Sequence, residues 1–134
     1  MEITALALAA KMKAWSVGLK DDAAMRQGAE LVKSEAKAAI GTYRYGWPRL
    51  KPATVARKGK DTPLLQTGEL KNSIESQKVG EHQYEVGSTS KKAVWHELGT
   101  ATIPPRPFLS EAARRREAQV HKLIDAHVKK TLGT

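Results

Sequence analysis

A short proline-rich segment in the last third of the chain constrains the fold more than any other feature. Residues 96–109 contain three prolines that enclose Arg106: Pro104, Pro105 and Pro107. Proline fixes its own φ angle and excludes the residue before it from the helical region. We therefore expect a stiff, extended backbone that begins after Gly99, presents Arg106 and leads Phe108 into a final helix. Local features alone are equally typical of an ordinary proline-punctuated loop.

Length and composition limit what the chain can be. With 134 residues we expect one domain, and 23 Lys and Arg against 14 Asp and Glu give a formal net charge of +9. Such a charge favours contact with nucleic acid, a membrane surface or an acidic protein. No cysteine is present, which excludes disulfides and thiolate zinc sites.

The apolar stretch 3–10 is not expected to be a secretory signal, because an acid precedes it where a signal has a basic start. No segment is apolar enough to span a membrane, so we expect a soluble protein.

Two helices are expected in residues 1–40. Alanine, leucine and lysine dominate residues 1–15, and Asp21 and Asp22 can cap a second helix that ends at Gly41. Apolar residues of this second helix recur at steps of three and four and predict its buried stripe: Met25, Ala29, Val32, Ala36 and Ile40. The charged residues are assigned to its other faces: Arg26, Glu30, Lys33, Glu35 and Lys37.

Residues 41–66 lack periodicity and are interpreted as a basic, aromatic loop. Glycine and proline recur throughout, and basic residues alternate with Tyr43, Tyr45 and Trp47. Two interpretations remain open. The loop could bind single-stranded nucleic acid by stacking bases on its rings, or it could be a solvated loop whose aromatics attach it to the domain. A long irregular loop in a compact domain is often functional.

Residues 67–108 are expected to contain a small sheet followed by the proline segment. Thr67 can cap a short helical turn, with Glu69 in its first turn. Alternation and turn residues predict the next elements: a strand at 74–79, a turn at 80–82, a strand at 83–88 and an apolar strand or short helix at 93–98.

A final helix is expected over residues 109–132. Its apolar residues define a buried side: Leu109, Ala112, Ala113, Val120, Leu123, Ile124 and Val128. The opposite side is basic: Arg114, Arg115, Arg116, Lys122, Lys129 and Lys130. A basic side of this kind is either a solvated face or a docking face for an acidic partner. The fold class is therefore α+β, with long N-terminal helices, a small antiparallel sheet and a C-terminal helix.

No pattern in the chain indicates catalysis. The four histidines do not have the spacing of metal ligands, and the Ser88 to Lys91 match to Ser-x-x-Lys is too short to be informative alone. The chain also lacks a glycine-rich phosphate-binding motif. We therefore expect no catalytic residue, no metal and no cofactor.

Several short motifs, taken together and in order, resemble those of bacteriophage virion-morphogenesis and tail-completion proteins. These motifs are Trp47-Pro-Arg-Leu, Thr54, Arg57-Lys58, Leu64-Leu-Gln-Thr-Gly-Glu-Leu70, Ser73-Ile74, His96-Glu-Leu-Gly-Thr100 and Pro105-Arg-Pro-Phe-Leu109. The resemblance covers roughly residues 47–112.

The resemblance implies a structural protein of the phage neck or minor tail, which completes the tail and joins it to the head. It implies a ring component whose partners are tail terminator, tube or head connector proteins, in the virion and, during assembly, in the host cytoplasm. Contact with DNA remains open, and no membrane contact is expected. A small basic nucleic-acid-binding protein is the alternative.

Two sets of residues carry these expectations. The candidate interface residues are Trp47, Arg49, Arg57, Lys58, Arg106, Arg114, Arg115 and Lys122. The candidate structural residues are Thr67, Gly68, Leu70, Ser73, Glu97, Gly99, Pro105, Pro107 and Phe108. Arg106 is assigned either to an interface or to an ion pair at the edge of the core with Glu97, because its planar fork suits both roles.

Overall fold

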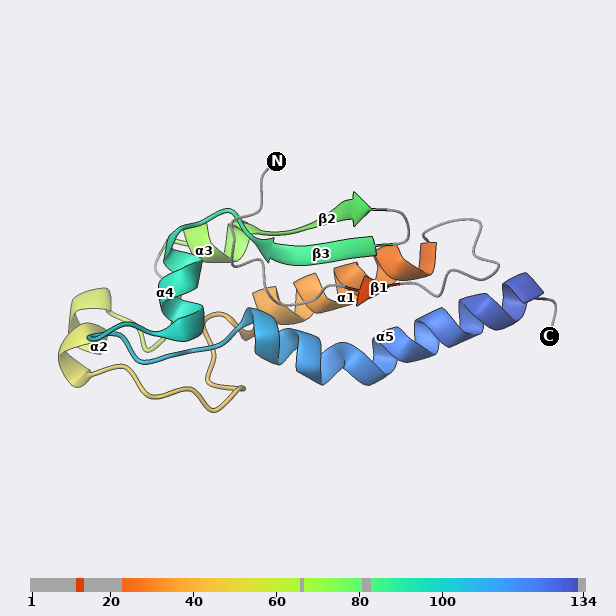
Figure 1. The fold of residues 1–134 in the computed structure, drawn as a ribbon. Coiled ribbons are helices and arrows are strands. Elements are labelled where there is room, and N and C mark those ends of the chain that lie inside the picture. Colours follow the sequence, from red (N-terminus) through yellow and green to blue (C-terminus); the bar gives the residue numbers. More distant parts are fainter. Residues whose placement is uncertain (1–11, 14–22, 66, 81–82, 133–134) are drawn as a thin grey trace.

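The chain folds into a sheet, a central helix and an outer helix, as an α+β protein. The computed structural model describes residues 12–13, 23–65, 67–80 and 83–132. In order, its elements are β1 (Met12–Lys13), α1 (Ala23–Ala39), α2 (Pro52–Lys58), α3 (Glu69–Asn72), β2 (Ile74–Gly80), β3 (Gln83–Ser88), α4 (Lys92–Leu98) and α5 (Leu109–Leu132). Helix α1 lies between the sheet and α5, and the short helices gather at one end of this body (Figure 1). The predicted fold class is confirmed.

The sheet is antiparallel, with strand order β1-β3-β2. Strands β2 and β3 form a hairpin in which Ile74 lies opposite Ser88, which confirms both predicted strands. Met12 and Lys13 pair with the free edge of β3. The prediction that the first helix extends through these two residues is therefore wrong, because backbone pairing along a sheet edge outweighs a helix-favouring composition. The rest of that predicted helix lies outside the described residues.

The core forms where α1 meets the sheet and the start of α5. The apolar stripe predicted for α1 is buried throughout, from Met25 at 1% exposure to Ile40 at 3%. Ile74 and Val86 contribute from the sheet, and Phe108 is fully buried at 0% exposure. Because Phe108 directly precedes α5, the core fixes the point where the proline segment becomes helix.

Residues 41–66 are not wholly irregular, which corrects the sequence interpretation. They contain α2, which starts with Pro52 in its first turn and ends at Gly59 in the left-handed conformation (φ 79°). Proline at the start and glycine just past the end are typical helix boundaries. The seven-residue helix is too short to reveal an apolar period, and none of its residues is fully buried.

A buried acid joins α1, the loop after it and α5. The Glu35 side chain is only 3% exposed, and its carboxylate lies 2.9 Å from a guanidinium nitrogen of Arg44 and 2.9 Å from Nε of Arg116. The Tyr45 hydroxyl donates a hydrogen bond to the same carboxylate at 2.5 Å. Burial and this hydrogen bond raise the pKa of Tyr45 well above its usual 10. Glu35 and Arg116 were both assigned to solvent faces; the structure instead pairs them between the two long helices.

Replacing this carboxylate should destabilise the protein without changing its shape. In Glu35→Gln the two arginines lose their counter-charge, and we expect the free energy of unfolding to fall by about 2 to 3 kcal/mol. Urea denaturation followed by circular dichroism measures this change. Glu117→Gln is the matched control on exposed α5 surface, with an expected change within about 0.5 kcal/mol. Equal effects of the two substitutions would show that the Glu35 cluster contributes no net stability.

Candidate functional site

Arg106 ties the proline segment to the loop that precedes α2. Its backbone N–H donates to the His96 carbonyl at 2.7 Å. Its side chain donates from Nε at 3.0 Å and from Nη2 at 2.8 Å to the Pro48 carbonyl. The residue is only 6% exposed. The predicted ion pair with Glu97 is wrong, because the guanidinium binds backbone carbonyls instead, a role that suits its planar fork.

Trp47 strengthens the same connection from the other side. Its indole N–H donates to the Pro107 carbonyl at 3.0 Å, and the ring packs edge-on against Tyr45 with centroids 5.5 Å apart. At 5% exposure Trp47 belongs to the core. Trp47 was predicted as an interface residue. In the structure it instead attaches the loop to the domain, which is the role that the second interpretation of residues 41–66 gave to the aromatic residues.

Glu97 organises the start of α5. Its carboxylate accepts hydrogen bonds from the backbone N–H groups of Phe108 at 3.0 Å and Ser110 at 2.7 Å. Burial raises the pKa of this carboxyl, and the hydrogen bonds from Ser110 and Phe108 oppose the rise. A carboxylate at a helix N-terminus satisfies free N–H groups and interacts favourably with the helix dipole. Glu97 thereby fixes the turn from the proline segment into the helix.

Gly99 is required where α4 meets the proline segment. It has φ 79° and ψ 166°, a region open essentially to glycine alone. A Cβ at this position would lie 2.9 Å from the backbone nitrogen of Pro105. The close approach of these two segments therefore depends on the missing side chain.

The Thr67 to Ser73 motif joins α3 to the sheet. The Thr67 hydroxyl accepts the Glu69 N–H at 3.3 Å, while Gly68 occupies the N-cap with φ 84°. At the other end, the Ser73 hydroxyl donates to the Leu70 carbonyl and lies 2.6 Å from the hydroxyl of buried Ser88. Leu70 is 6% exposed and packs in the core. Thr67, the predicted cap, thus lies one residue before the N-cap position.

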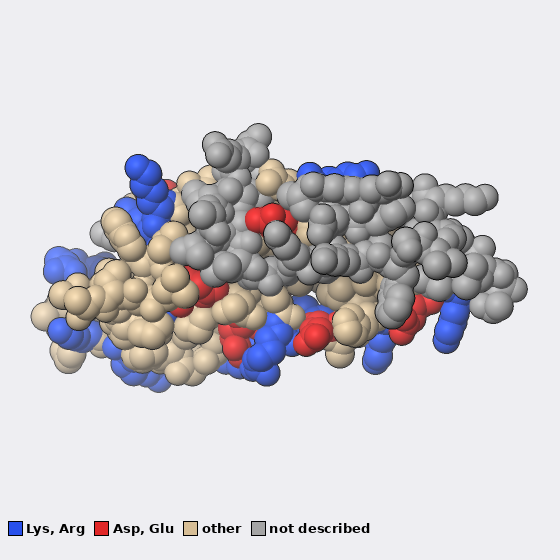
Figure 2. All heavy atoms as spheres, viewed as in Figure 1, with Lys and Arg blue, Asp and Glu red and all other residues tan. Residues whose placement is uncertain are grey.

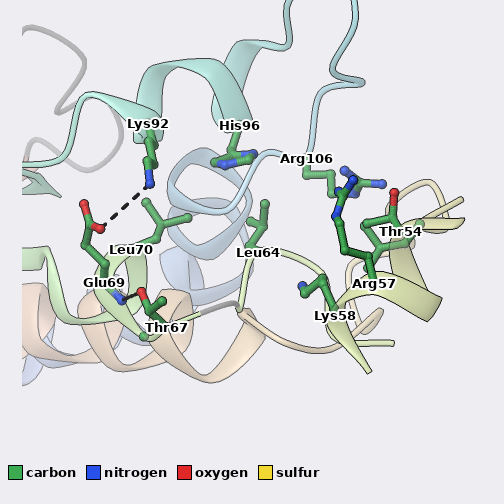
Figure 3. Close-up of a pocket in the computed structure, with 12 residues that line it drawn as sticks. Thr54, Arg57, Lys58, Leu64, Thr67, Glu69, Leu70, Lys92, His96 and Arg106 are labelled. Carbon is green, nitrogen blue, oxygen red and sulfur yellow. Dashed lines mark hydrogen bonds and ion pairs between the residues drawn. The ribbon is translucent and has the colours of Figure 1, made fainter. Parts of the chain in front are cut away.

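A pocket of about 320 Å³ opens among α2, α3, α4 and Arg106. Its walls are basic and neutral apart from one acid, Glu69, and come from four separate segments: Leu50, Thr54, Arg57, Lys58, Leu64, Thr67, Gly68, Glu69, Leu70, Lys92, His96 and Arg106. We call it the basic pocket. Arg57 extends from α2 toward Arg106, and Lys92 and His96 come from α4 on the other side (Figure 3).

Positive charge depresses the pKa of two groups in the basic pocket. Burial lowers the pKa of His96 below its usual 6.5, and Arg106, Lys92 and Lys58 lower it further by repulsion. Burial and Arg106 likewise lower the pKa of Lys58. The cations that line the pocket therefore lie close enough together to repel one another.

The other predicted interface residues lie outside the pocket. Arg49 is exposed beside Asp61 at 3.6 Å and stacks over Tyr43 at 4.1 Å. On α5, Arg114 and Arg115 both pair with Glu111, and Arg115 also stacks over Tyr45 at 4.6 Å. Lys122 is exposed further along the helix. Basic and acidic side chains alternate along this edge of the molecule (Figure 2). The structure therefore brings together Arg57, Lys58 and Arg106 but not the α5 residues.

The sequence analysis did not assign Glu35, Lys92 or His96 to these roles. A signal for Glu35 was present, because it follows Gly28 and Val32 in a row of small and apolar residues on α1 that are all buried. Lys92 and His96 come from an apolar segment, and only the folded α4 shows that they line the pocket.

Two further findings limit the chemistry of the described residues. Among them, no three His, Asp or Glu side chains are arranged to hold a metal ion. The helices in the described ranges include none that is both long and apolar enough to cross a bilayer.

A small sheet, two long helices and a connected proline segment make up the described fold, and its class is given by a family match. Residues 7–99 match the family described as "Bacteriophage HK97-gp10, putative tail-component". The match covers well over half of the chain, so the protein belongs to the HK97 gp10-like family of phage tail components. No curated protein and no solved structure gives a significant match. The matched range ends at Gly99, before the proline segment and α5.

Replacing Arg106 by lysine tests the connection between the proline segment and the loop. Lysine keeps the charge but cannot direct two donors at the Pro48 carbonyl, so we expect the free energy of unfolding to fall by about 2 kcal/mol. Tryptophan fluorescence during urea denaturation measures the loss. Arg49→Lys is the control on an exposed arginine, with an expected change within about 0.5 kcal/mol. If Arg106→Lys matches its control, the guanidinium fork is dispensable.

The depressed pKa of His96 predicts acid sensitivity. Below about pH 6.5 the unfolded chain binds a proton at His96 that the folded protein resists, so stability should fall as the pH decreases toward the folded pKa. We expect a steeper loss of stability from about pH 7.5 to pH 5.5 in the wild type than in His96→Gln. Urea midpoints at several pH values measure both slopes. Identical slopes would mean that His96 titrates normally.

Proposed function

We propose that this protein completes the phage tail and joins it to the head, as a virion component in the neck or minor tail. Membership of the HK97 gp10-like family of tail components carries the proposal. A tail component acts by contact with other phage structural proteins, and we assign those partners to the tail terminator, the tail tube or the head connector. During assembly the protein would act in the host cytoplasm.

The exposed side of α5 is our candidate for one of these contacts. Arg114 and Lys122 are exposed on it, and among the residues that the structure describes Arg114 pairs with one acid, Glu111 from the preceding turn. Opposite charges across an interface steer association and fix its register. The other candidate contact is α4, where Trp95 is 47% and Leu98 is 58% exposed. Exposed tryptophan is typical of protein interfaces.

Two different contact surfaces on one chain fit a homo-oligomeric ring. Contacts between unlike surfaces of identical subunits generate a closed ring when their rotation closes. Helix α4 lies at the end of the molecule where the short helices gather, whereas α5 runs from that end toward the opposite one (Figure 1). In such a ring one of these surfaces meets a different surface of the next copy, and we propose that the other meets the tail or the connector. The comparisons offer no support for the nucleic-acid-binding alternative.

Charge reversal in the phage or prophage tests this function. Arg114→Glu combined with Lys122→Glu should leave the protein folded, since exposed substitutions change stability by about 0.5 kcal/mol each. Arg115 is left intact because it packs on Tyr45. We expect separate filled heads and tails by electron microscopy, as in a deletion of the gene, with a large loss of infectious yield.

Arg26→Glu with Lys60→Glu provides the control, because it makes the same charge change at exposed positions away from α5. It should give normal particles. Normal particles from the α5 variant would remove this surface from the joining step. A deletion that leaves heads and tails joined would overturn the proposed function itself.

A further inference from the structure

The residues that line the basic pocket carry an excess of positive charge. Four Lys and Arg side chains line it against one carboxylate, which leaves a formal charge of +3. The carboxylate, Glu69, lies 3.8 Å from Lys92 on the rim, and both side chains are more than half exposed. Three cations, one from the proline segment and two from α2, therefore lack an acidic partner in the pocket: Arg57, Lys58 and Arg106.

Two polar groups at the pocket also lack hydrogen-bond partners. The buried Nδ1 of His96 has none. Arg57 is exposed and makes no hydrogen bond or ion pair with any part of the chain that the structure describes. Buried polar atoms in native proteins are nearly always paired, so the unpaired Nδ1 of His96 needs an explanation. Lys58 and Arg106 donate to backbone carbonyls, those of Thr62 and Pro48, and neither receives a carboxylate within the pocket. An anion entering the pocket would supply acceptors for Arg57 and offset the repulsion around His96.

The walls of the pocket indicate what kind of anion fits. Leu50, Leu64 and Leu70 line it together with the hydroxyls of Thr54 and Thr67. Leu64 is held at φ 66°, a conformation unusual for a bulky residue that is often found at functional sites. Apolar walls below converging cations suit a carboxylate carried on an aliphatic stem. Duplex DNA is instead contacted by cations spread along a row of phosphates, and a hollow lined by three leucines does not offer such a row.

The size of the pocket agrees with a single side chain and its neighbours. A volume of about 320 Å³ lies at the lower end of the range for ligand pockets. It is large enough for a glutamate side chain and part of an adjoining aliphatic residue. The Arg106 hydrogen bonds join three of the four segments that build the pocket, which restricts its shape before a ligand arrives and reduces the entropic cost of binding.

We propose that the basic pocket binds a glutamate carboxylate in an acidic, aliphatic segment of a neighbouring virion protein. In the bound state Arg57 and Lys58 contact the carboxylate from α2, and the leucines contact the aliphatic part of the segment. This assignment of the neighbour rests on the proposed function. Binding of a carboxylate in the basic pocket would be one partner contact, separate from a contact through the exposed side of α5.

Peptide titration of the full, isotopically labelled chain by nuclear magnetic resonance tests the proposal. The probe is the capped peptide acetyl-Leu-Glu-Leu-amide, and the matched probe carries Gln in place of Glu. We expect saturable shifts at the pocket residues with the Glu peptide and none with the Gln peptide. Arg57→Ala should weaken binding of the Glu peptide about fivefold, the effect of losing one partly exposed ion pair.

Lys51→Ala is the matched variant, because Lys51 is exposed beside α2 but does not line the pocket. It should bind the Glu peptide like the wild type. Equal shifts from both peptides, no saturable shift, or equal losses in the two variants would each overturn the proposal.

Two further probes distinguish other occupants. If inorganic phosphate binds the pocket as tightly as the Glu peptide, the site holds free anions and the proposal fails. If a short DNA duplex displaces the peptide and binds more tightly, the nucleic-acid alternative replaces it. Because these titrations use purified protein, their outcome is independent of whether heads and tails join in the phage.

Discussion

The hydrogen bonds between Arg106 and the Pro48 carbonyl are the constraint on which one end of this molecule depends. They join the proline segment to the loop before α2, and Trp47 adds a second bond to Pro107 in the opposite direction. Together these bonds hold α2 and α4 facing each other across the basic pocket. Without them the two helices would be linked only through flexible turns, and the pocket would have no fixed shape.

The Glu35 cluster joins distant segments in the body of the molecule, as Arg106 does at its end. It places a negative charge among Arg44, Tyr45 and Arg116, so that α1, the following loop and α5 share one buried polar centre. Removing an acid from such a centre costs more than forming it gains, because the partners are left desolvated and unpaired. A buried polar centre of this kind also disfavours alternative helix packings, since only one arrangement brings all four groups together.

The sequence predicted those parts of the fold that depend on local periodicity. The α1 stripe from Met25 to Ile40, the strand at 83–88 and the burial of Phe108 follow from residues that are close together in the chain. Helix α2 was missed because seven residues show no period, although Pro52 and Gly59 marked its ends.

The candidate site was less accessible to sequence reasoning. Arg57, Lys58 and Arg106 were each selected, but their meeting in one pocket depends on tertiary contacts. Glu35 was misplaced because an acid inside an apolar stripe contradicts the rule used to find the stripe. The prolines around Arg106 marked this residue in the sequence, whereas its partner, the Pro48 carbonyl, lies 58 residues earlier and carries no local signal.

That separation determines when the pocket can exist. The Trp47 indole N–H can form its hydrogen bond only when Pro107, 60 residues later, is present. The Arg106 side-chain bonds and the Glu97 cap on α5 depend on the same late segment. Closing contacts between distant segments requires much of the chain to be present and its entropy to be lost first. A ribosome-bound or truncated chain that stops before residue 106 can form the hairpin, but it has no pocket to offer a neighbour. Because the pocket depends on these long-range bonds, only a chain that includes the proline segment can form the proposed binding site.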